Sequence, residues 1–84
     1  MKFEYKTSGT CSRKITLDID GDVLRSVEFE GGCNGNLKGI SSLCSGMKID
    51  DIIEKTKGIK CGFKTTSCPD QLANALEAYK KSIN

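Results

Sequence analysis

Histidine is absent from the sequence, and its absence limits the chemistry open to the protein. A Ser-His-Asp triad, a Cys-His pair and a mixed Cys/His zinc site are all excluded. Because histidine is absent, any reaction or metal site must use thiols, carboxylates, amines or backbone groups. Aromatic residues are also scarce, at 6% of the 84 residues, and proline occurs once.

The sequence also lacks an excess of one charge and any long apolar run. Its 13 basic and 11 acidic residues are interspersed and give a net charge of +2, which does not favour a nucleic-acid partner. No apolar run approaches the ~20 residues of a membrane span, and the N-terminal segment lacks the apolar core of a secretory signal. We therefore expect a cytoplasmic protein without a membrane partner.

The length of the chain is enough for one domain, so residues 1–84 are expected to form a single unit. With 37% apolar and 29% charged residues, the composition is that of a globular protein. A domain this small buries a modest share of its surface and often gains stability from a metal or a cross-link.

Apolar residues in the first third of the chain alternate with polar ones, which is typical of β-strands with one buried face. Ile15, Leu17 and Ile19 show the alternation most clearly, and the Asp-Gly turn that follows them favours a hairpin. We therefore expect residues 2–30 to form a three-stranded antiparallel meander.

The apolar spacing then becomes helical, and three helices are expected. The first has its apolar stripe at Leu37, Ile40, Leu43 and Cys44. The second spans residues 51–56 with Asp50 as its cap, and the third begins at Pro69. The apolar stripe of the third helix is Leu72, Ala75, Leu76 and Tyr79. Strands followed by helices without alternation predict an α+β fold, with the helices packed on one face of the sheet.

Four of the five cysteines fall in the predicted loops or at a helix start. These are Cys11, Cys33, Cys61 and Cys68, whereas Cys44 lies on an apolar helix stripe and is interpreted as a core residue. Without an export signal, cysteines are expected to be reduced or bound to metal, and an odd number argues against a closed disulfide framework. Because loops can bring thiolates to one point, these four residues are the candidate ligands of a metal site.

The position of Cys68 beside Pro69 suggests a particular environment for its thiol. If Pro69 is the first helical residue, Cys68 is the N-cap, where unpaired backbone N–H groups and the helix dipole favour the thiolate. The alternative is that Ser67 or Thr66 caps the helix and the thiol has no role. The sequence leaves both interpretations open.

Residues 66–70 read Thr-Ser-Cys-Pro-Asp, the signature of the TSCPD domain family. The segments 9–11, 31–36 and 60–62 also resemble those of the small stand-alone members. The family is similar to a C-terminal appendage of adenosylcobalamin-dependent ribonucleotide reductases. This resemblance implies an association with ribonucleotide reduction and DNA precursor synthesis. A complete reductase needs a large barrel that this chain is too short to build, so whether the chain is an enzyme is left open.

The order of the elements is also similar to that of the NifU-type iron–sulfur scaffold. That resemblance implies that Cys11, Cys33 and Cys68 meet at one end of the molecule to hold zinc or a nascent cluster. The sequence departs from the scaffold in two places: Ser12-Arg13 replaces an acidic residue, and Ser67 replaces a histidine. Cys61 is the candidate for the fourth ligand.

Three functions are compatible with these residues. The first is a metal-binding module in which the four loop cysteines hold zinc or an iron–sulfur cluster. The second is a thiol-redox accessory that reduces a disulfide in a ribonucleotide reductase or another redox protein, with Cys68 as nucleophile and Cys61 or Cys33 as the resolving thiol. The third is a non-catalytic binding or assembly module.

Overall fold

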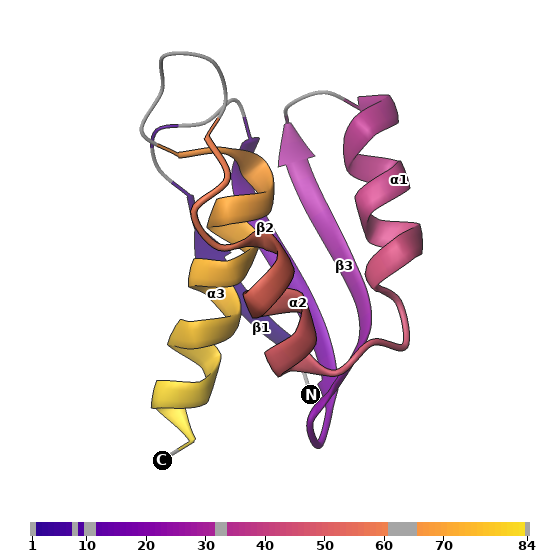
Figure 1. Cartoon of the computed structure of the whole chain (residues 1–84), viewed down its shortest axis with the longest axis vertical. Coiled ribbons are helices and arrows are strands. Elements are labelled where there is room, and N and C mark those ends of the chain that lie inside the picture. Colours follow the sequence, from indigo (N-terminus) through magenta and orange to yellow (C-terminus); the bar gives the residue numbers. More distant parts are fainter. Residues whose placement is uncertain (1, 8, 10–11, 32–33, 61–65, 84) are drawn as a thin grey trace.

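The computed structural model describes residues 2–7, 9, 12–31, 34–60 and 66–83, except for the side chain of residue 34 (Figure 1). Its strands are β1 (Lys2–Lys6), β2 (Ser12–Asp20) and β3 (Val23–Gly31), and its helices are α1 (Asn34–Cys44), α2 (Ile49–Thr56) and α3 (Cys68–Ser82). The strands form one antiparallel sheet in the order β1-β2-β3. The predicted α+β fold, a three-stranded sheet followed by three helices, is confirmed.

The alternation predicted for β2 is present in the structure. Ile15, Leu17 and Ile19 are each at most 1% exposed and form the centre of the core. The β2–β3 turn contains Gly21 with φ of +64°, a left-handed conformation that glycine adopts at little cost. The short turn therefore fixes the register that turns these three side chains inward.

Two β-bulges interrupt the pairing of β2 with β3. The partner of Ile19 is Leu24 and the partner of Asp18 is Ser26, so Arg25 is an extra residue on β3. An extra residue reverses the alternation beyond it, which lets Leu24 and Val27 both face the core although they are three positions apart. The second bulge lies on β2 near its first residue and matters for the candidate site.

Helices α2 and α3 lie over the sheet, whereas α1 lies beside β3 (Figure 1). On α1, Leu37 and Cys44 are buried and Ile40 is half-buried, but Leu43 is 77% exposed. The prediction that Leu43 belongs to the buried stripe is therefore wrong. Because α1 packs chiefly against the edge strand β3, only a narrow part of its surface is covered, and Leu43 lies at the rim of an apolar groove that also reaches Ile59.

Helix α2 begins earlier than expected, because Ile49 is its first residue. Lys48 occupies the N-cap position without a side-chain hydrogen bond, so the prediction that Asp50 caps this helix is wrong. Asp50 instead lies in the first turn, where its carboxylate accepts a hydrogen bond from the ammonium group of Lys80 on α3. Ile52 is buried, whereas Ile53 is half-buried.

Helix α3 supplies the largest part of the helical core. The predicted stripe is buried at all four positions, Leu72, Ala75, Leu76 and Tyr79. The ring of Tyr79 meets that of Phe3 edge to face, with ring centroids 5.7 Å apart, and so joins α3 to β1. No helix in the described part of the chain is long and apolar enough to cross a membrane.

Candidate functional site

Cys68 is the one predicted ligand that the structure describes; Cys11, Cys33 and Cys61 lie outside the described residues. The Cys68 side chain is buried, and its thiol donates to the hydroxyl oxygen of Ser12 across 3.3 Å. Within the described ranges, no group of three or more Cys, His, Asp or Glu residues is placed to hold a metal ion. The four-cysteine site therefore stays a prediction, and the described neighbours of these cysteines show where it would lie.

The described neighbours of Cys11 and Cys33 lie close to Cys68. Ser12, which follows Cys11 in the sequence, contacts Cys68 directly and pairs with Gly31 in the sheet. Gly31 is two positions before Cys33. The end of β3 and the start of β2 therefore lie at the start of α3, and Figure 1 shows these ends together at one end of the molecule.

A second contact joins the β1–β2 connection to the segment before α3. At Gly9, which has φ of +76°, an added Cβ would lie only 3.0 Å from the methyl carbon of Thr66. Real Cβ atoms rarely come this close to another atom, so the backbone at this position approaches Thr66 more tightly than a larger residue would allow. Gly9 and Thr66 each lie two positions before a candidate ligand, Cys11 and Cys68.

The segment before Cys61 is held at the same helix start by two hydrogen bonds. The hydroxyl of Ser67 donates to the carbonyl oxygen of Ile59 at 2.6 Å, and the backbone N–H of Gly58 donates to a carboxylate oxygen of Asp70, also at 2.6 Å. Described residues near all four candidate ligands thus lie around the N-terminal end of α3.

Ser67, not Cys68, is the N-cap of α3. Its backbone is extended and its side-chain oxygen accepts from the N–H of Asp70 at 3.1 Å, so Cys68 is the first helical residue. The interpretation of Cys68 as the cap is wrong by one position, and the alternative cap by Ser67 is the one observed. A hydroxyl oxygen is a stronger hydrogen-bond acceptor than a thiol sulfur, and Pro69 needs no N–H partner in the first turn.

The carboxylate of Asp70 is the centre of a small polar network. It accepts hydrogen bonds from the Thr66 hydroxyl and the Gly58 N–H, and these two bonds, with the nearby charge of Lys57, hold the pKa of Asp70 below its usual value. The buried side chain of Gln71 donates to the Thr66 hydroxyl oxygen at 3.0 Å. The sequence interpretation missed these contacts. Ser-x-x-Asp at a helix start is a signal for the Ser67 cap, but it does not indicate the partners of the Asp70 carboxylate.

The contact between Ser12 and Cys68 depends on the second β-bulge. Ser12 pairs with Gly31 but Lys14 pairs with Glu30, so Arg13 is an extra residue on β2. Arg13 is exposed, whereas Ser12 is only 3% exposed and faces the start of α3. Strict alternation would have turned Ser12 away from the face that Ile15 occupies, so no sequence pattern could have identified it.

Cys44 has the structural role that the sequence predicted. It is 6% exposed and belongs to the hydrophobic core, and burial raises the pKa of its thiol. A raised pKa keeps the thiol protonated and unreactive. This cysteine is therefore not a candidate ligand.

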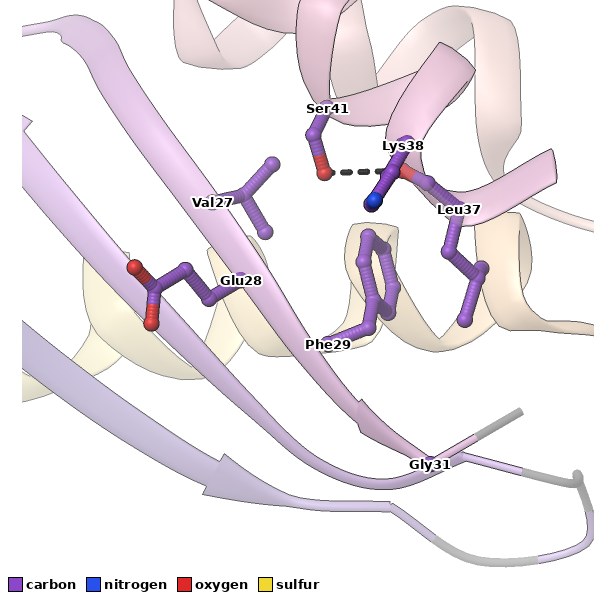
Figure 2. A pocket seen from close by; sticks show the side chains of 7 residues that line it. All are labelled: Val27, Glu28, Phe29, Gly31, Leu37, Lys38 and Ser41. Carbon is purple, nitrogen blue, oxygen red and sulfur yellow. Dashed lines mark hydrogen bonds between the residues drawn. The ribbon is translucent and has the colours of Figure 1, made fainter. Parts of the chain in front are cut away.

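A cleft of about 340 Å³ lies between β3 and α1 and reaches Gly31 (Figure 2). Val27 and Phe29 point from the strand toward the helix, and Lys38 points down from the helix above Phe29. The Ser41 hydroxyl is used within α1, where it donates to the carbonyl of Leu37 at 2.8 Å. The described lining of this cleft supplies one carboxylate and no thiol, so it is not a metal site of the predicted kind.

Comparison with known proteins gives one result for this chain. Residues 2–80 match the family described as the TSCPD domain. No curated protein and no solved structure was matched, so the similarity to the NifU-type scaffold stays a prediction. Because the family match covers nearly the whole chain, the protein belongs to the TSCPD domain family.

Proposed function

We propose that this protein is a small metal-binding module in which Cys11, Cys33, Cys61 and Cys68 hold zinc or an iron–sulfur cluster. The observation that carries the proposal is the convergence of described residues near all four cysteines on the start of α3. Ser12 contacts the Cys68 thiol and pairs with Gly31, while Ile59 and Gly58 are bonded to the first turn of α3. Four segments of the chain are thus tied to one place.

The chemistry of the donor set fits these metals. Four thiolates form the tetrahedral site that structural zinc prefers, and the same ligands hold iron–sulfur clusters. Cys68 is buried beside a hydroxyl group and sits at the positive end of the 15-residue helix α3, where the helix dipole favours a negatively charged complex. Because histidine is absent, thiolates are the strongest metal ligands in the chain.

We place this module in the cytoplasm as an accessory of ribonucleotide reductase or of another redox protein. Support comes from membership of the TSCPD domain family. The resemblance of that family to a C-terminal appendage of adenosylcobalamin-dependent reductases suggests the partner. In this role the domain contributes metal binding and partner contact to DNA precursor synthesis, and the reductase contributes the radical chemistry.

The metal content of the protein tests the proposal directly. The full chain is purified without oxygen, supplied with zinc or with iron and sulfide, and analysed for metal per chain by mass spectrometry. We expect one zinc ion or one cluster per chain, lost in the Cys68→Ser and Cys33→Ser variants. The Cys44→Ala variant is the matched control and should keep its metal, because Cys44 lies in the apolar core.

Two results would contradict the proposal. A metal-free protein that readily forms a disulfide between Cys61 and Cys68 would favour a thiol-redox accessory. A metal-free protein in which neither thiol oxidises would leave a non-catalytic binding or assembly module.

A further inference from the structure

The thiol of Cys68 contacts the side chain of Ser12, a residue outside the Thr-Ser-Cys-Pro-Asp segment. Ser12 Oγ lies 3.3 Å from Cys68 Sγ, and the two residues are 3% and 9% exposed. They are 56 positions apart in the sequence, so the contact joins the sheet to the start of α3. We propose that Ser12 is a positioning residue for the metal site, whose hydroxyl donates a hydrogen bond to the Cys68 sulfur when that sulfur binds metal.

The backbone around Ser12 is built to hold this hydroxyl in place. The bulge at Arg13 turns Ser12 toward the helix start. Thr7 fixes both sides of the bulge: its hydroxyl donates to the carbonyl of Ser12 at 2.5 Å, and its N–H donates to the carbonyl of Arg13 at 3.2 Å. A bulge interrupts the regular strand pairing, and this one places the Ser12 hydroxyl against the buried Cys68 thiol.

Metal binding reverses the direction of the Ser12–Cys68 hydrogen bond. In the described arrangement the Cys68 thiol is the donor. When the sulfur binds a divalent metal, its proton is released to solvent and the thiolate can only accept. The Ser12 hydroxyl, which can donate as well as accept, is then the donor of this hydrogen bond.

The donated hydrogen bond has a defined effect on a four-thiolate site. Four thiolates around a divalent metal carry a net charge of about −2, and each hydrogen bond donated to a sulfur spreads part of that charge. Partners that orient or neutralise metal ligands typically change affinity by about 10–100-fold. The hydroxyl of Ser12 is neutral, so it adds no further negative charge beside the thiolates.

This inference rests on the proposed function, and the experiment separates the two. Zinc affinity of the oxygen-free full chain is measured by competition with a chromophoric chelator, and cobalt is used to record the thiolate-to-metal absorption. We expect Ser12→Ala to weaken zinc binding about 10–100-fold and to shift the cobalt–thiolate band. Ser12→Thr keeps the hydroxyl and should stay within about threefold of the original chain.

Ser41→Ala is the matched control, since it removes a part-buried hydroxyl that bonds within α1. It should leave zinc affinity unchanged. The melting temperature of each metal-free variant is recorded as well, because a purely structural role of Ser12 would lower that temperature and leave the cobalt band in place.

The outcomes of this experiment are distinct. Zinc affinity of Ser12→Ala within twofold of the original chain would overturn the role of Ser12 and leave the metal module intact. Failure of the original chain itself to bind zinc or cobalt would overturn both. Equal losses in Ser12→Ala and Ser12→Thr would show that packing, not the hydroxyl, is responsible.

Discussion

Replacing Asp70 with asparagine is predicted to destabilise the protein by removing the charge that holds two segments together. The carboxylate accepts the Gly58 N–H at 2.6 Å and the Thr66 hydroxyl. An asparagine side chain has one carbonyl oxygen and an NH₂ group, so it cannot accept both donors in this geometry. Hydrogen bonds to buried charged groups contribute about 1.5–3 kcal/mol each, and the partial exposure of Asp70 reduces the expected loss to about 1 kcal/mol.

The pH dependence gives this prediction a sign that can be checked. The pKa of Asp70 is lower in the folded state than the value of about 3.9 in an unfolded chain, so the folded state binds fewer protons. The stabilisation is therefore complete above the unfolded value and is lost as the pH falls through the lower folded value. The difference between the original chain and Asp70→Asn should shrink as the solution is acidified.

Urea unfolding of the reduced, metal-free chain at pH 7 and at pH 3 measures both effects. For a small domain, a loss of about 1 kcal/mol lowers the midpoint by roughly 1 M urea. Asp50→Asn is the matched control, because the Asp50 side chain is 77% exposed and its ion pair with Lys80 should contribute less than about 0.5 kcal/mol. Equal destabilisation by the two substitutions, or a difference that does not shrink at low pH, would refute the reasoning.

Two further predictions concern the core. Burial raises the pKa of the Cys44 thiol, so the stability that the buried thiol contributes is present below the unfolded value of about 8.5 and is lost as the pH rises through the raised folded value. Peptide-resolved alkylation at pH 8 should label Cys44 about 100-fold faster in urea than in the native state. Equal labelling rates would contradict the burial of Cys44. Leu37→Ala should lower the free energy of unfolding by about 2–4 kcal/mol, whereas Leu43→Ala should lower it by less than about 0.5 kcal/mol because Leu43 is 77% exposed. Similar losses for the two substitutions would contradict the packing of α1 through Leu37.

The sequence was sufficient for the parts of the fold that depend on local periodicity. Ile15, Leu17 and Ile19 alternate, and the stripe of α3 repeats at helical spacing, so the buried face of each element followed directly. Leu43 and the cap of α2 were predicted incorrectly because their environment depends on how neighbouring elements pack. α1 lies beside the edge strand β3, which covers less of its surface than the middle of a sheet would.

The candidate site shows a different limit of sequence interpretation. Cysteine positions could be found from composition and loop placement, and Cys68 does lie at a helix start as expected. Ser12 could not be found, because its orientation depends on a bulge that breaks the alternation used to assign strand faces. The partners of Asp70 were equally hidden, since one of them, Gly58, comes from a segment 12 positions away.

The residues of the Thr-Ser-Cys-Pro-Asp segment form hydrogen bonds to two different parts of the chain. Ser67 caps α3 and holds Ile59, and Asp70 holds Gly58 and Thr66, so the polar groups of the segment are used to fix the chain that leads to Cys61. The thiol of Cys68 instead contacts Ser12, the first residue of β2. A motif needed only to start a helix would require neither a bond to the preceding segment nor a thiol facing a distant strand. The arrangement therefore supports the proposal that this segment presents Cys68 as one ligand of a metal site.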